Sequence, residues 1–357
     1  MWQPLKNGEI NKWVYVGGDE FNDTTLNTAK WAYHYPWQKS DCDEFYTEGD
    51  NYEFVNAANK DSGMLKLVVK KETATGHKYT YCHDGTADAD NCIQADGQKN
   101  LRTFNYTSGM IISREKFKYG LFEMKFRLPE GQGLFPAFWL FGGALNEEID
   151  IFEYKGETPG RIMANVHCQD GCSKFGGWHK ATGLFTEDFN VIMVDWSPLG
   201  ITWYLNGLEY ASWQGEINHQ LHLIASFAVA GEGLCGLSKP RRKRTVNKST
   251  PFPASFEIDY IRVYSKLHCE QDTAIENYTQ TDTDVTVITG QNISIQNLHL
   301  KPGQYLNVFS TQAISIHNQL QNQGNLIQKI VACPNPSNSG PYPEFLPNDR
   351  IKIRNSR

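Results

Sequence analysis

The feature that most constrains this chain is a short segment with three acidic side chains, residues 148–153 (EIDIFE). Apolar and acidic residues alternate at its start, which is typical of a strand with one buried face. Glu148 and Asp150 therefore point to the same face. Glu153 is an odd number of positions after both Glu148 and Asp150, so an unbroken strand would turn its side chain to the opposite face. We therefore predict a β-bulge near residues 151–152, whose one extra residue returns Glu153 to the shared face.

Three like charges on one strand repel each other, and a purely structural sheet gains nothing from them. Retaining glycoside hydrolysis uses such neighbours: an ionised carboxylate attacks, and a protonated carboxyl about 5–5.5 Å away acts as the acid. Repulsion and burial push the pKa values of adjacent acids apart, which provides an acid and a base in one site. The alternative is an exposed strand face that merely carries acids. The aromatic run directly before the segment, residues 135–142 (FPAFWLFG), favours a buried strand leading into a site.

Strand-like segments dominate the chain up to Tyr264, and long amphipathic helices are scarce. Asn206-Gly207 follows one such segment and is a strong hairpin signal, because both residue types tolerate the positive φ angles of a two-residue turn. Many short strands joined by turns are typical of a β-sandwich or jelly roll. We therefore predict an all-β fold with strands at residues 64–70, 119–128, 191–196, 201–205, 221–228 and 256–264.

The composition changes after Tyr264, where Gln, Asn, Thr and Ser become frequent. A short alternating pattern recurs at residues 285–288, 293–295 and 314–316, and Lys301-Pro302-Gly303 supplies a turn signal between two of these segments. We predict a small, stacked, β-rich C-terminal module at residues 266–357, of unknown role, after a catalytic domain at residues 1–265.

The composition excludes some classes of function. The net charge is only −6, which gives no global field for nucleic acid or an anionic membrane. No apolar run approaches the roughly 20 residues that cross a bilayer. Aromatic residues make up 13% of the chain, and they pack cores as well as stack on sugar rings. We expect a monomer whose partner is a polysaccharide, with no nucleic acid and no membrane span.

The chain has eight cysteines, with close pairs at Cys82 and Cys92 and at Cys168 and Cys172. Neither pair is joined to the second Cys or His pair of a zinc site. We interpret them mainly as disulfides of an oxidising compartment, with free buried thiols as the alternative. The start of the chain carries no signal peptide pattern, so we expect the mature form of a secreted or cell-surface protein.

A series of segments in order resembles glycoside hydrolase family 16, and in particular its laminarinase-like (endo-β-1,3-glucanase) members. The resemblance covers about residues 13–264. It rests on residues 19–22 (DEFN), 117–123 (FKYGLFE), 127–133 (RLPEGQG), 136–140 (PAFWL), 148–153, 194–196 (VDW), 201–207 (ITWYLNG), 252–253 (FP) and 258–264 (IDYIRVY).

The resemblance implies a curved β-sandwich jelly roll with a concave substrate cleft. It implies that Glu148 is the nucleophile, Asp150 its assistant and Glu153 the acid/base of a retaining, endo-acting enzyme that needs no cofactor for catalysis. It also places Trp139, His167 and Tyr46 along the cleft. For Trp139 the alternative is core packing, and for His167 it is an ordinary core or loop histidine.

Members of the family often carry a structural calcium ion on the outer sheet. The matching positions here are Glu20, Gly63 and Asp259, partly through backbone oxygens, and ligation by oxygen alone suits Ca²⁺. The alternative is that no ion binds.

The basic run at residues 239–244, with Arg241 and Arg242, departs from the family pattern. It is either a solvated loop or a contact for a charged glycan, since guanidinium groups match sulfate and carboxylate oxygens. On the resemblance, the first hypothesis for the substrate is β-1,3-glucan or mixed β-1,3/1,4-glucan. The second, which a contact of the basic run with a charged glycan would favour, is an algal galactan such as carrageenan, porphyran or agarose. The third is a lectin that binds glycans without cutting them.

Overall fold

The computed structural model describes residues 12–56, 63–81, 97, 99–142, 147–168, 179–230, 245–267, 273–276, 285–298, 305–317 and 325–330. These residues form strands and connecting loops, and none of them lies in a helix long and apolar enough to cross a membrane. The chain divides into two compact units, residues 18–262 and residues 1–17 with 263–357.

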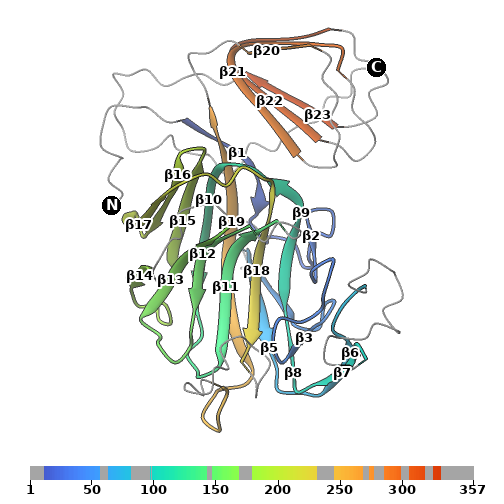
Figure 1. Cartoon of the computed structure of the whole chain (residues 1–357), viewed down its shortest axis with the longest axis vertical. Coiled ribbons are helices and arrows are strands. Elements are labelled where there is room, and N and C mark those ends of the chain that lie inside the picture. Colours follow the sequence, from blue (N-terminus) through green and yellow to red (C-terminus); the bar gives the residue numbers. More distant parts are fainter. Residues whose placement is uncertain are drawn as a thin grey trace. The chain divides into compact units, whose positions relative to one another are not determined.

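The first large sheet has eight strands in the order β17-β16-β15-β10-β19-β5-β4, with β1 also paired to β19 (Figure 1). Its strands are β1 (Lys12–Asp19), β4 (Tyr52–Asn56), β5 (Gly63–Val69), β10 (Gly120–Arg127), β15 (Asn190–Ser197), β16 (Gly200–Leu205), β17 (Leu208–Gln214) and β19 (Ala254–Leu267).

The second large sheet has seven strands in the order β14-β13-β12-β11-β18-β9-β2. The acidic segment forms β12, near the centre of this sheet between β11 and β13. The strands are β2 (Trp31–Ala32), β9 (Met110–Phe117), β11 (Leu134–Phe141), β12 (Glu148–Tyr154), β13 (Arg161–His167), β14 (His179–Thr182) and β18 (Leu221–Val229).

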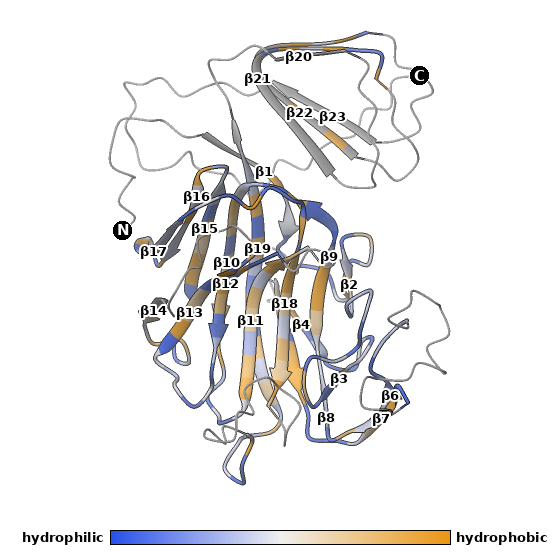
Figure 2. Cartoon of the chain, viewed as in Figure 1, coloured by the Kyte–Doolittle hydropathy of each residue, from blue (hydrophilic) through white to orange (hydrophobic). Residues whose placement is uncertain are grey.

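The core lies between the two sheets, and aromatic side chains join them. Phe152 of β12 stacks on Phe126 of β10 with ring centroids 4.7 Å apart, and it meets Phe256 of β19 edge-on at 5.9 Å. All three side chains are fully buried, which stabilises the fold by about 1.5–3 kcal/mol for each of them. Hydrophobic residues also run along β9, β11 and β18 (Figure 2). This sandwich confirms the predicted all-β fold.

The predicted hairpin is present between β16 and β17. Asn206 and Gly207 have φ angles of 48° and 80°, and Leu205 pairs with Leu208 across the turn. Two left-handed residues in succession match the twist of the flanking strands, which is why the Asn-Gly pair forms a tight connection here.

The C-terminal region forms a four-stranded parallel sheet in the order β20-β21-β22-β23. Ile293 pairs with Ile314 and Ile295 with Ile316, so the repeated segments stack in register as predicted. The turn expected at residues 301–303 lies outside the described residues, and β19 runs past the expected domain boundary at residue 265. The strands are β20 (Thr273–Glu276), β21 (Val285–Gln296), β22 (Tyr305–His317) and β23 (Asn325–Ile330).

Two small sheets complete the described strands. They pair β3 (Glu44–Tyr46) with β8 (Tyr106–Ser108) and β6 (Ala74–His77) with β7 (Leu101–Phe104).

Candidate active site

A β-bulge interrupts β12 where the sequence pattern predicts it. Asp150 pairs with Asn165 of β13, whereas Glu153 pairs with Met163, so three steps along β12 match two steps along β13. The pairing with β11 shifts at the same place. The extra residue of β12 therefore lies at positions 151–152, which confirms the predicted bulge.

The bulge brings the three acids to one face of the sheet. Glu148 lies opposite Phe141 of β11, Asp150 opposite Trp139, and Glu153 opposite Ala137. Paired residues share a face, and every second residue of a strand does too. Trp139, Phe141 and Ala137 are separated by two positions each, so all three acids lie on the Trp139 face.

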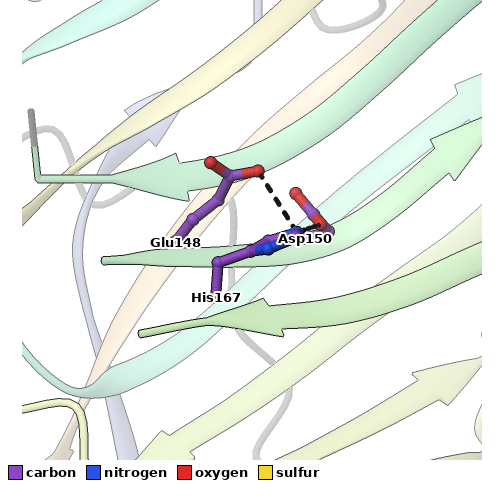
Figure 3. Close-up of side chains that lie close together, drawn as sticks. All are labelled: Glu148, Asp150 and His167. Atoms are coloured by element: carbon purple, nitrogen blue, oxygen red, sulfur yellow. Dashed lines mark ion pairs between the residues drawn. The ribbon is translucent and has the colours of Figure 1, made fainter. Parts of the chain in front are cut away.

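Glu148, Asp150 and His167 converge in the centre of this face (Figure 3). The Nε2 atom of His167 lies 3.4 Å from Oδ2 of Asp150 and 3.9 Å from Oε1 of Glu148. His167 is exposed and pairs with Glu148 across β12 and β13. The histidine therefore stands beside the first two acids, as the sequence analysis expects of a polar residue in the site. These three side chains are also close enough together to hold a metal ion, but no other observation points to one.

Burial raises the pKa of all three acids, and their mutual repulsion raises it further. The pKa of Glu148 rises to about 9, with Asp150 as the main charged neighbour, while His167 opposes the shift. Asp150 is 2% exposed, and its pKa lies well above the usual value because of burial and the charge of Glu153. A hydrogen bond between the two carboxyls also raises the pKa of Glu148 and lowers that of Asp150, so the two acids share a proton and their titration belongs to the pair.

Glu153 is suited to hold a proton at neutral pH. Burial and the charge of Glu148 raise its pKa to about 7, and Lys155 opposes the shift. Among the described residues, its Oε2 atom is buried without a hydrogen-bond partner. A buried polar atom without a partner is rare and marks a place where a ligand atom can bind.

An aromatic cluster (Tyr35, Trp37, Trp139 and Phe141) lies beside the acids. Tyr35 stacks on Trp37 at 5.3 Å and meets Trp139 edge-on at 5.9 Å, and Trp37 meets Phe141 at 5.5 Å. The indole N–H of Trp139 donates to Ser226 Oγ at 3.2 Å. Trp37, Trp139 and Phe141 are half-buried, so part of each ring is open to a ligand.

Tyr46 occupies a different place from the one the resemblance implies. Its side chain is fully buried, and its hydroxyl donates to Asp41 Oδ2 at 2.8 Å. Tyr35 donates to the same oxygen at 2.7 Å. Tyr46 therefore reaches the aromatic cluster through Asp41 and Tyr35, and contact with a ligand in this conformation is excluded by its burial.

Asp41, Tyr35 and Trp37 belong to the site although the sequence analysis did not single them out. Asp41 is half-buried, and its negative charge contributes to the raised pKa of Glu148. Their segment is irregular in structure, so no periodic pattern marks these residues. Only the tertiary fold brings them close to β11 and β12.

The residues expected to bind calcium do not fit an ion. Both carboxylate oxygens of Glu20 accept bonds from the Arg262 guanidinium, at 2.7 and 2.9 Å. Asp259 Oδ2 lies 2.9 Å from the Lys125 ammonium. The protein's own cations thus neutralise both acids, and Asp259 lacks a free pair of oxygens for Ca²⁺. The remaining expected residue, Gly63, approaches Phe21 so closely that a Cβ would lie 2.1 Å from the Phe21 carbonyl oxygen.

Several expected residues lie outside the described part of the chain. These are Arg241 and Arg242 of the basic run, together with Cys82, Cys92 and Cys172. The two cysteines that are described, Cys42 and Cys168, are both disulfide-bonded.

Residues 52–220 match the model of the family Glycosyl hydrolases family 16. The chain is 28% identical over 278 residues to the Glucan endo-1,3-beta-glucosidase A1 of Niallia circulans, covering 70% of this chain and 37% of that protein. It is 26% identical to the Beta-glucanase of Rhodothermus marinus, covering 71% of this chain and 85% of that one. The chain thus spans well under half the length of the first of these relatives.

The fold is similar to that of the endo-beta-1,3-glucanase from Pyrococcus furiosus. The TM-score is 0.55 and the sequence identity 27%, over 72% of this chain and 96% of that one. The sandwich is therefore a jelly roll, as predicted. The matched segment includes β12 with its three acids and β13 with His167. The region of the chain that carries these residues therefore belongs to glycosyl hydrolase family 16.

Proposed function

We propose that this protein is a retaining, endo-acting glycoside hydrolase that cleaves internal bonds of β-1,3-glucan or of mixed β-1,3/1,4-glucan. The observation that carries the proposal is the bulge in β12, because it brings Glu148, Asp150 and Glu153 to one face. The similarity to the glucanases of Niallia circulans and Rhodothermus marinus supports the choice of glucan.

Hydrolysis proceeds by double displacement. The ionised Glu148 attacks the anomeric carbon while Glu153 gives its proton to the leaving oxygen, so the glycosidic bond breaks as a glycosyl ester forms. Glu153, now ionised, takes a proton from water. The resulting hydroxide equivalent attacks the same carbon, releases Glu148 and retains the anomeric configuration.

Asp150 and His167 control the charge on Glu148. In the reactive form the proton shared by the first two acids is on Asp150, because Glu148 attacks as the ionised carboxylate, and the deeper burial of Asp150 favours its neutral form. Asp150 then donates a hydrogen bond to the nucleophile. The nearby His167 lowers the pKa of Glu148 and so opposes the rise that burial causes. Neither a metal ion nor an organic cofactor is needed for these steps.

The aromatic cluster supplies the binding surface for sugar. Trp139 and Phe141 flank Asp150 and Glu148 directly, so a sugar ring that stacks there has its glycosidic bond near the acids. Arg241 and Arg242 of the basic run would bind charged substituents through their guanidinium groups if the substrate carries them.

We further propose that the enzyme acts outside the cytoplasm as a monomer, and that the C-terminal region is a module apart from the chemistry. The disulfide-bonded Cys42 and Cys168 support an oxidising compartment.

The deciding experiment is a product assay on laminarin, lichenan, agarose, porphyran and κ-carrageenan, with proton NMR of the first product. We expect oligosaccharides from laminarin or lichenan, with the β-anomer formed first. Cleavage of a galactan alone would replace the glucan by the galactan as substrate. Binding of any of these polymers with no product would indicate a lectin, and inversion of the anomer would exclude Glu148 as nucleophile.

A further inference from the structure

The bulge in β12 places two backbone carbonyls where a regular ladder is interrupted. A bulge disrupts the hydrogen bonds between strands at its position, and a buried carbonyl without a donor costs free energy. Here the carbonyl oxygen of Asp150 accepts a bond from the Trp203 indole N–H at 3.0 Å. The carbonyl oxygen of Ile151 accepts one from the Tyr210 hydroxyl at 3.2 Å.

Both donors come from the opposite sheet of the sandwich. Trp203 is on β16 and Tyr210 on β17, whereas the acids are on β12 of the other sheet. Trp203 is fully buried. The pairing of β16 with β17 itself shifts register between Trp203 and Tyr204, and such shifts re-aim side chains. The bulge in β12 is thus accompanied by a register shift in β16 and β17, directly at Trp203, whose indole donates across the core.

We propose that Trp203 and Tyr210 are positioning residues for the reaction, because they hold the bulge that turns Glu153 toward Glu148. This inference rests on the proposed function. Without the two donors, the carbonyls at the bulge recover partners when β12 slips into regular pairing. A slip by one residue turns every following side chain to the other face, so Glu153 leaves the acids while the strand itself persists.

The chain offers matched controls for both donors. Trp196 is also a buried indole of the eight-stranded sheet that donates to a backbone carbonyl, that of Ile217, at 3.1 Å. Tyr52 is a buried tyrosine whose hydroxyl donates to the carbonyl of Met110 at 2.6 Å. Each control loses the same kind of bond as its counterpart, but on a segment other than β12, and Tyr52→Phe also loses the bond that the hydroxyl accepts from the Met110 N–H.

The test compares Trp203→Phe with Trp196→Phe and Tyr210→Phe with Tyr52→Phe, in kcat, KM and melting temperature. We expect kcat to fall about tenfold to a hundredfold in the first member of each pair, with KM unchanged. Each control should lose at least as much melting temperature as its counterpart. Equal kcat values within both pairs, or losses that follow melting temperature alone, would overturn the inference.

A second measurement does not depend on turnover. Carbon NMR follows the titration of the Glu153 carboxyl in wild type, Tyr210→Phe and Tyr52→Phe. We expect its pKa to rise further in Tyr210→Phe alone, because the other face of β12 is the core between the two sheets and burial there disfavours the ionised carboxyl. If the wild type cleaves no polysaccharide but this rise is seen, the proposed function fails and the positioning stands. If the wild type is active and the titration is the same in all three, the positioning fails.

Discussion

Asp150 pairs with Trp139 across β11 and β12, and the register of the two strands shifts directly beyond this pair. The most deeply buried acid and the central aromatic residue of the face therefore lie side by side, at the edge of the bulge. One strand irregularity sets the direction of Glu153 and leaves Glu148 and Asp150 beside Trp139. The nucleophile, the acid and the binding surface are thus linked by the backbone of β12. Each of them can nevertheless be tested by its own substitution.

Replacing Glu148 by Ser is expected to abolish turnover while substrate binding persists. The serine cannot form the glycosyl ester, and losses of about 10⁴-fold or more follow when a covalent nucleophile is removed. The measurement is kcat on the cleaved glucan, with calorimetric binding of an oligosaccharide. Glu147→Gln is the matched control, because Glu147 is the adjacent acid but pairs with His219 at 2.8 Å. Turnover retained in Glu148→Ser would refute the assigned nucleophile.

Replacing Trp139 by Ala is expected to raise KM about tenfold, equivalent to about 1.4 kcal/mol of lost binding. The ring is half-buried beside Asp150, so part of it is open to a sugar. Ser226→Ala separates stacking from hydrogen bonding, since it removes the acceptor of the indole N–H and a hydrogen bond to Tyr35 but leaves the Trp139 ring in place. KM should stay near the wild-type value in that variant. An unchanged KM in Trp139→Ala would assign the side chain to core packing.

The bulge could be predicted from the sequence because the period of a strand is local. Glu153 has the wrong parity for the face of Glu148 and Asp150, and one inserted residue corrects it. The Asn206-Gly207 turn was predictable for the same reason, since both φ angles depend on the two residues themselves. Patterns of this kind need no knowledge of the rest of the fold.

The partners of the bulge could not be predicted, because they depend on how the two sheets pack. Trp203 and Tyr210 are distant in sequence from Asp150 and Ile151, whose carbonyls they meet only across the core. Tyr46 shows the same limit, since a resemblance assigns it to the cleft while the fold buries it behind Asp41. The ion pair of Lys125 with Asp259 at the expected calcium site was equally unpredictable, because it joins neighbouring strands of the sheet.

A calcium chelator is expected to leave the melting temperature unchanged, because Lys125 and Arg262 already neutralise the two acids of the expected site. Lys125→Met should lower it by about 2–4 °C, since a half-exposed ion pair contributes at most about 1 kcal/mol. Lys125→Arg keeps the charge and should match the wild type. A drop on chelation that added Ca²⁺ reverses would establish an ion at Glu20, Gly63 and Asp259.

Replacing Lys155 by Met is expected to extend activity to higher pH. Glu153 must be protonated to act as the acid, so kcat/KM falls as pH rises through its pKa of about 7. The positive charge of Lys155 lowers that pKa. Its removal therefore raises the pKa, keeps Glu153 protonated at higher pH and moves the basic limb of the profile upward. The measurement is kcat/KM against pH for the wild type, Lys155→Met and Lys155→Arg.

Lys155→Arg retains the charge and should leave the basic limb where the wild type has it. The acidic limb reports the titration of the pair formed by Glu148 and Asp150. Lys155 is not among the groups that shift the pKa values of these two acids. It should therefore coincide in all three proteins. A basic limb that stays in place in Lys155→Met, or moves to lower pH, would mean that a group other than Glu153 carries the leaving-group proton.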